Sequence, residues 1–239
     1  MGTAIVVTSG KGGTGKTSIT GGVAGSLARL GHSVLCIDMD IGLRNLDISL
    51  GLSDRALMDF SDVAEGRCPL VRAAVNHPDL PGLALLTAPM TLSPALTEEA
   101  VRRMLDTARS LYDYVLIDSP AGLGAGFRMA CCGADRAIVV STNDASSLRD
   151  AQRTVGELDF LRQIHLVMNR IQPKLLRQLR TTIDDAMDTA GLPLLGVVPE
   201  DPQVMLSANL GRPLILGGRQ GAANACLNIA KRLEGRRVP

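Results

Sequence analysis

An octet near the start of the chain has the residue types and the spacing needed to bind phosphate groups. Residues 10–17 read GKGGTGKT and match the pattern G-x-x-x-x-G-K-[ST]. Glycines let backbone N–H groups approach phosphate oxygens, the final lysine supplies positive charge, and the threonine hydroxyl can bind Mg²⁺. An apolar run precedes the octet and a segment that can start a helix follows it, which favours a nucleotide-binding loop over a simple glycine-rich turn. The residues expected to contact the nucleotide here are Gly10, Lys11, Gly12, Gly13, Thr14, Gly15, Lys16, Thr17 and Ser18.

A second lysine stands directly after the first glycine of the octet. Lys11 is not required for holding phosphates within one chain, and one interpretation is an ordinary solvated surface lysine. Because Gly12 and Gly13 have no side chains to shield it, Lys11 could instead reach a phosphate bound by another copy of the chain. On these residues alone, both interpretations stay open.

Acidic residues follow two apolar runs that have the character of buried strands. Asp38 and Asp40 come at the end of the first run, and Asp118 ends the second. A single such aspartate is equally well explained by a turn or a helix cap. In open α/β sheets, however, ligands bind beyond the carboxyl ends of the strands, where these carboxylates would meet the phosphate loop. Mg²⁺ is usually held by one or two carboxylates together with nucleotide phosphates, so the pattern predicts a Mg²⁺ site.

Short aliphatic runs alternate with helical patterns along the chain. This alternation is typical of βαβ units and predicts an α/β fold, with a mostly parallel twisted sheet and helices on both faces. The predicted strands are Ala4–Thr8, Val34–Asp38, Leu83–Thr87, Tyr114–Asp118, Ala137–Ser141, His165–Asn169 and Leu194–Val198. The predicted helices include Ser18–Leu30, Thr97–Leu111, Ser147–Leu161 and Leu175–Ala190.

Length and composition limit the class of protein. No linker or charge block divides the 239 residues, so we predict a single domain over residues 1–239. A formal net charge of +1 and an aromatic content of 2% argue against specific nucleic-acid binding and base stacking. The 5 cysteines have no C-x-x-C spacing and are interpreted as reduced, buried thiols of a cytoplasmic protein. No signal peptide or membrane span is expected, because the first strand starts at once and no apolar stretch is long enough.

Four ordered motifs resemble the ParA/MinD family of deviant Walker A ATPases over essentially the whole chain. They are GKGGTGKT at 10–17, DMDIGLRNLD at 38–47, DSPAG at 118–122 and VVPED at 197–201. Within that family, the segments DIGLRNLD and SSLRDAQR are similar to the MinD branch. The resemblance implies an ATPase that acts as an ATP-dependent dimeric switch in the placement of the bacterial division septum.

The resemblance also implies roles for individual residues. Two nucleotides would lie at the interface of a homodimer, with Lys11 of each subunit reaching the phosphates held by the other. Lys16 would contact the β and γ phosphates of ATP, and Asp40 would orient or activate the attacking water. Gly122 would sense the γ-phosphate and, with Asp40, belong to the switch.

The metal and base contacts follow from the same resemblance. Thr17 would bind Mg²⁺, Asp118 would hold the metal through water, and Asp38 would support the metal site. Two segments that end strands resemble the family's adenine-side contacts, namely Asn169, Arg170, Pro199, Glu200 and Asp201.

A helix near residues 146–161 resembles the MinD surface that binds partner proteins, such as a division inhibitor or an activator. Its candidate contact residues are Arg149, Asp150 and Arg153, and a solvated helix face is the alternative. The apolar positions at 222–233 follow helical spacing but lack aromatic residues, so we predict a core-packing helix and do not expect direct membrane insertion. The protein would be cytoplasmic, or peripheral at the inner face of the cell membrane through a weak contact of Arg236 and Arg237.

Three other functions compete with this one. A ParA-like ATPase that positions DNA or other cargo is favoured by Lys174, Arg177 and Arg180, which fall on one face of a predicted helix. An iron–sulphur carrier of the nitrogenase-reductase type is suggested by Cys131 and Cys132, although adjacent cysteines are poorly placed as joint ligands. A nucleotide-gated scaffold with negligible turnover is the third.

Overall fold

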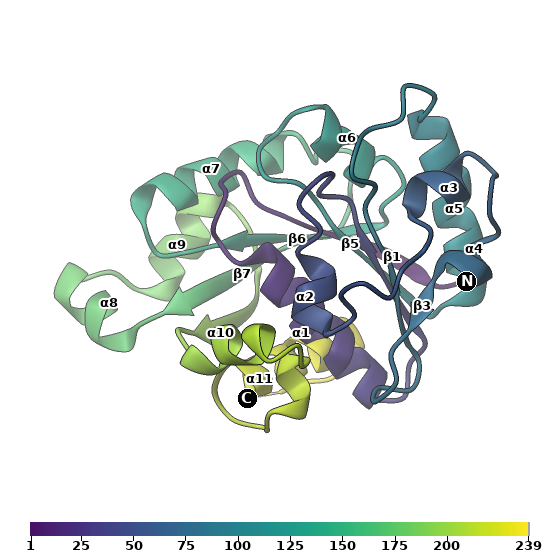
Figure 1. The fold of residues 1–239 in the computed structure, drawn as a ribbon. Helices are drawn as coiled ribbons and strands as arrows, with labels where there is room; N and C mark the ends of the chain where they lie inside the picture. The colour runs from purple at the N-terminus through teal and green to yellow at the C-terminus, as the bar shows by residue number, and fades with distance from the viewer. Residues whose placement is uncertain (239) are drawn as a thin grey trace.

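The strands of the chain form one eight-stranded sheet (Figure 1). The computed structural model describes residues 1–238. In spatial order the strands run β3-β4-β2-β5-β1-β6-β7-β8. They are β1 (Thr3–Thr8), β2 (Val34–Asp38), β3 (Val75–Asn76), β4 (Leu83–Leu86), β5 (Tyr114–Asp118), β6 (Arg136–Ser141), β7 (Ile164–Ile171) and β8 (Leu194–Pro199).

All neighbouring strands pair in parallel except β3, which pairs antiparallel with β4 at the edge. The prediction of a mostly parallel sheet is therefore confirmed. Strand β3 was not predicted, because two residues are too short to show a periodic pattern. Strand β2 is fully buried and β5 is buried except at Tyr114, as expected when helices cover both faces of a parallel sheet.

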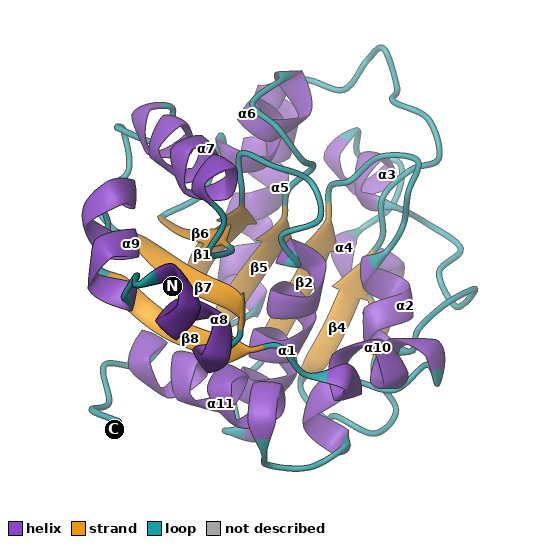
Figure 2. Ribbon diagram, turned by 90° about the vertical axis from the view of Figure 1, so that its left-hand side faces the viewer, coloured by secondary structure: helices purple, strands orange, loops and turns teal. Residues whose placement is uncertain are grey.

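Helices lie on both faces of the sheet (Figure 2). One buried cluster joins the sheet to α1 and α11, and a second joins the opposite face to α5, α7 and α9. The helices are α1 (Lys16–Arg29), α2 (Leu46–Leu50), α3 (Phe60–Ala64), α4 (Leu70–Ala73), α5 (Glu98–Leu111), α6 (Ala125–Cys131), α7 (Ala145–Gly156), α8 (Pro173–Leu179), α9 (Ile183–Ala190), α10 (Pro202–Asn209) and α11 (Gly221–Leu233), with a short 3₁₀ turn, η1 (Leu214–Leu216).

Helix α1, which begins at the phosphate loop, packs closely against α11. A glycine inside a helix costs about 1 kcal/mol relative to alanine. Close helix packing explains the glycine at position 22, because an added Cβ would lie 2.6 Å from the Sγ of Cys226 on α11. The small residue therefore lets the two helices approach, and this contact helps to fix α1 beneath the loop.

Two predicted helices have different limits in the structure. Helix α7 starts at Ala145 and ends at Gly156, earlier than the predicted span 147–161. The predicted helix 175–190 is wrong, because α8 ends at Leu179 and Arg180 adopts a left-handed backbone conformation, with φ 53°. Thr182 then starts α9 with a capping box. Lys174, Arg177 and Arg180 therefore do not share one continuous helical face.

The predictions for the C-terminal helix and the cysteines agree with the structure. Helix α11 buries the predicted apolar positions Ala222, Cys226, Ile229, Ala230 and Leu233. All the cysteines are free and buried. Within residues 1–238, no helix is both long enough and apolar enough to cross a membrane.

Candidate nucleotide site

The phosphate loop connects the end of β1 to the start of α1. Gly15 is the residue that caps α1; it has a left-handed backbone (φ 89°) and makes no side-chain hydrogen bond to the free N–H groups of the first helical turn. Those N–H groups and the positive end of the helix dipole are thus available to an anion. Lys16 is only 8% exposed, so its ammonium group is held at the site and not in bulk water.

Gly10 is fixed by a close contact with the rest of the molecule. A Cβ at this position would lie 2.4 Å from the carbonyl oxygen of Asp150 on α7. Only glycine fits there without moving the helix or the loop. The requirement for glycine at the start of the motif therefore comes in part from packing against α7.

Asp38 and Asp118 lie side by side where β2 and β5 end. The two residues are register partners on neighbouring parallel strands, and each is 1% exposed. The Oδ1 and Oδ2 atoms of Asp38 accept hydrogen bonds from the N–H groups of Asp40 (2.9 Å) and Leu46 (3.2 Å). Asp118 accepts one from the hydroxyl of Thr20 (3.1 Å). The sheet thus brings together two buried carboxylates that are 80 positions apart in sequence.

Burial changes the proton affinity of these groups. Desolvation raises the pKa of Asp118 to about 7, assisted by the charge of Asp38 and opposed by a hydrogen bond from Thr17. Desolvation likewise raises the pKa of Asp38 to about 6. The pKa of Lys16 is lowered by burial, against the attraction of Asp118 and Asp40. Two buried carboxylates beside a single lysine favour an additional cation.

These residues fit a Mg²⁺ ion bound together with a nucleotide. Among residues 1–238, no group of three or more His, Cys, Asp or Glu side chains could hold a metal ion. Asp38, Asp118 and the hydroxyl of Thr17 offer only part of an octahedral oxygen shell, and Mg²⁺ normally completes that shell with phosphate oxygens and water. The fold thus brings the predicted metal residues together, and a bound nucleotide could supply further oxygen ligands to the metal.

The predicted switch residues lie in the loops that follow these two strands. Asp40 is half-buried, and its pKa is raised by desolvation against the attraction of Lys16. Gly122 has φ 82° and open space where a Cβ would be. Its neighbour Ala121 packs against the phosphate loop, since a Cβ at Gly12 would lie 3.8 Å from the Cβ of Ala121.

Lys11 has an intramolecular partner that the sequence did not reveal. Its Nζ atom lies 3.2 Å from Oδ1 of Asp144 and 2.8 Å from the hydroxyl oxygen of Ser146. Asp144 also caps α7, accepting the N–H of Ser147 at 2.9 Å. Its pKa is lowered well below the usual range, because hydrogen bonds from Ser146 and neighbouring groups outweigh its partial burial. The cap position could be inferred from sequence, but its contact with Lys11, 133 residues away, could not.

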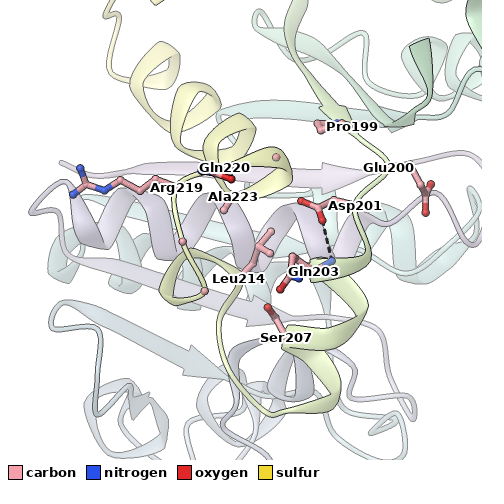
Figure 3. Close-up of a pocket in the computed structure, with 12 residues that line it drawn as sticks. Pro199, Glu200, Asp201, Gln203, Ser207, Leu214, Arg219, Gln220 and Ala223 are labelled. Carbon is pink, nitrogen blue, oxygen red and sulfur yellow. Dashed lines mark hydrogen bonds between the residues drawn. The ribbon is translucent and has the colours of Figure 1, made fainter. Parts of the chain in front are cut away.

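The residues predicted on the base side surround a cavity of about 750 Å³ that opens from the phosphate loop. Asn169, Arg170 and segment 199–201 all contribute to its wall. A second cavity of about 710 Å³ adjoins it beyond segment 199–201, between α10, η1 and the start of α11 (Figure 3). Ser207, Leu214 and Arg219 are among the residues that line this second cavity.

Asp201 has a structural task that the sequence did not indicate. Its Oδ1 atom accepts the N–H of Gln203 at 2.9 Å, and its Oδ2 atom accepts the N–H of Ala222 at 2.9 Å. One carboxylate therefore caps the N-termini of both α10 and α11. Asn169 also has a partner, since its Nδ2 donates to the carbonyl oxygen of Thr14 at 2.7 Å.

The predicted partner surface lies on α7. Arg149 and Arg153 are exposed, while Asp150 is half-buried and 3.6 Å from Arg153. The helix touches the phosphate loop at Gly10 and holds Lys11 through its N-terminal cap. A protein bound to α7 would therefore lie next to the loop.

The sheet topology and the site together define a phosphate-loop nucleotide-binding protein. A family model described as the CobQ/CobB/MinD/ParA nucleotide binding domain matches residues 5–214. The chain belongs to this family. The septum site-determining protein MinD of Synechocystis sp. is 40% identical to it over 240 residues, which cover 98% of this chain and 90% of that protein.

Solved structures of MinD proteins have the same fold. MinD in the MinC:MinD cell division protein complex of Aquifex aeolicus superposes with a TM-score of 0.92 at 37% identity, covering 99% of this chain and 97% of that one. MinD from Pyrococcus horikoshii, complexed with Mg-ADP, has a TM-score of 0.86 at 28% identity, covering 98% and 96%. These similarities confirm the predicted family and its MinD branch: the chain is a MinD-like cell division ATPase.

Proposed function

We propose that the chain is a Mg²⁺-dependent ATPase that works as an ATP-dependent dimeric switch in placing the division septum. The observation that carries the proposal is the pairing of buried Asp38 and Asp118 beside Lys16 and Thr17. The Mg-ADP bound by the Pyrococcus relative supports the choice of ligand and metal.

The chemistry is an in-line transfer of the γ-phosphoryl group to water. Charge on the transferring oxygens would be neutralised by Lys16 and by the N–H groups of the loop. Bound Mg²⁺, held by Thr17 with support from Asp118 and Asp38, would supply further charge neutralisation. Asp40 is half-exposed beside Lys16, which suits the proposed role of orienting the attacking water.

The dimer would complete the charge around the phosphates. In the free chain Lys11 is held by Asp144, so its ammonium group is paired away from its own phosphate site. Release of Lys11 toward the nucleotide of a second copy would supply the missing cation. Turnover should then be slow in the monomer and rise with protein concentration.

A division-inhibitor protein is the proposed partner, because the Aquifex relative is found in a complex with MinC. The proposed contact surface is the exposed part of α7 around Arg149, Asp150 and Arg153. The proposed place of action is the cytoplasm and the inner face of the cell membrane.

Phosphate release, measured with ATP and Mg²⁺ over a range of protein concentrations, tests the function. Wild-type specific activity should rise with concentration, and Lys11→Ala should bind ATP normally but lose this rise. Equal loss of ATP binding and turnover in Lys11→Ala would refute the role of Lys11. Dimerisation with ATP but without phosphate release would indicate a nucleotide-gated scaffold instead.

A further inference from the structure

An irregularity in strand β7 brings Arg170 against the phosphate loop. The pairing of β7 with β8 shifts register between Met168 and Ile171, and Arg170 has a left-handed backbone with φ 57°. Such a conformation is strained for a residue with a Cβ and is kept only where the surroundings enforce it. It directs the guanidinium group toward the loop, where Nη1 donates to the carbonyl oxygen of Gly13 at 3.4 Å.

Two successive carbonyl groups of the loop are held from the same strand. Arg170 bonds the oxygen of Gly13, and Asn169 bonds the oxygen of Thr14 at 2.7 Å. In a planar trans peptide the C=O and the following N–H point in opposite directions. Holding the Gly13 and Thr14 oxygens against β7 therefore turns the N–H groups of Thr14 and Gly15 away from β7, toward the phosphate side of the loop.

The carbonyl group of Gly13 depends on its hydrogen bond from β7 more than the carbonyl group of Thr14 does. Asn169 is buried and needs no further support, and Thr14 is itself 2% exposed. Gly13 is exposed, has φ 80°, and has open space where a Cβ would lie, so it has no packed side chain to hold its conformation. If that peptide turned over, its carbonyl oxygen would face the phosphates and repel them.

Arg170 is in turn anchored by the base-side segment. Its Nε atom lies 3.2 Å from Oε2 of Glu200, and the N–H of Glu200 donates to the carbonyl oxygen of Ile171 at 3.1 Å. The Arg170 side chain is 54% exposed, so without this carboxylate it would sample many rotamers. A chain of contacts thus runs from Glu200 through Arg170 to Gly13.

We propose that Arg170 is a positioning residue, which orients the Gly13–Thr14 peptide for phosphate binding and is itself held in place by Glu200. This inference rests on the proposed nucleotide-binding function and deepens it. It assigns Arg170 to the phosphate loop and not to the base, and it couples the base-side segment to the loop.

Arg170→Gly is the informative substitution. Glycine accepts the left-handed backbone, so the variant should fold while losing only the side chain. Arg180→Gly is the matched control, because Arg180 has nearly the same conformation (φ 53°) but caps α8. Unfolding in urea without nucleotide should give similar midpoints for both variants.

Dissociation constants for Mg-ATP and for adenosine, measured by calorimetry, then test the role. Arg170→Gly should weaken ATP binding about fivefold to twentyfold and leave adenosine binding unchanged, while Arg180→Gly matches the wild type. Glu200→Gln should weaken ATP binding about twofold to fourfold, and adding it to Arg170→Gly should cause no further loss. Arg170→Lys, which keeps the charge, should recover part of the affinity.

Three results would overturn the inference while leaving the proposed function intact. Wild-type ATP affinity in Arg170→Gly would show that the side chain does not position the loop. Equal losses for ATP and adenosine would make Arg170 a base contact, and additive losses from the two substitutions would show that Glu200 does not act through it. Failure of the wild type to bind ATP would refute the proposed function, and this inference with it.

Discussion

The Asp144→Asn substitution tests whether the ion pair that holds Lys11 in the free chain opposes dimer formation. The two charged atoms are 3.2 Å apart, and the side chains are 44% and 51% exposed. Ion pairs this exposed contribute roughly 0–1 kcal/mol, so about 0.5 kcal/mol is lost per subunit when Lys11 leaves. Asparagine caps helices as well as aspartate does and should keep the bond to the N–H of Ser147, so α7 should stay intact.

The expected effect is a tighter dimer. Two subunits release two ion pairs, so removing the charge of Asp144 should favour dimerisation by about 1 kcal/mol, or about fivefold in the dimer dissociation constant. Sedimentation in a non-hydrolysable ATP analogue measures that constant directly. The difference between variant and wild type should shrink in 1 M salt, because screening weakens an exposed ion pair.

A charge control separates the ion pair from a change in net charge. Asp188→Asn removes the same charge from the exposed side of α9 and should leave the dimer unchanged. If Asp144→Asn dimerises no better than Asp188→Asn, Lys11 is not restrained by Asp144. A weaker dimer in Asp144→Asn would show that Asp144 contributes to the interface itself.

Three further predictions concern the free chain and are measured by urea unfolding without nucleotide. Asp201→Ala should lose about 2 kcal/mol, since one carboxylate caps two helices and each cap contributes about 1 kcal/mol; a loss below about 0.5 kcal/mol would contradict this. Gly10→Ala should lose about 1–3 kcal/mol through overlap with α7, whereas Gly12→Ala, which has room for a methyl group, should lose less; equal losses would exclude the packing argument. His77 is buried, accepts two backbone N–H groups on Nδ1, and has a lowered pKa because of desolvation. As the pH falls, His77 is therefore protonated in the unfolded chain before it is protonated in the folded chain. The free energy of unfolding should thus decrease as the pH drops below about 6.5, and His77→Gln should reduce this dependence.

The sequence was a good guide wherever the signal was local. The octet 10–17 predicts phosphate binding by itself, because each residue type in it has a separate expected role. The aspartates that end two apolar runs could be placed at one edge of the sheet, since carboxyl ends of parallel strands meet there. Helix limits were less well predicted, as at Arg180, because a left-handed residue with a Cβ has no reliable signature in one sequence.

Contacts between distant segments were decided by the tertiary structure alone. The sequence showed that Lys11 is an additional lysine in the phosphate loop, but its ion pair with Asp144 depends on how α7 packs against Gly10. Asn169 and Arg170 could be placed at a strand end, but their hydrogen bonds to the loop carbonyls occur where the pairing of β7 with β8 shifts register, and one sequence does not show that shift. The sequence by itself thus predicted which groups could bind phosphate, and it predicted that they meet at one edge of the sheet. Only the tertiary structure decided which groups form hydrogen bonds and ion pairs with one another. These interactions act over a few ångströms, and the order of residues in the chain does not specify distances between remote segments that finely.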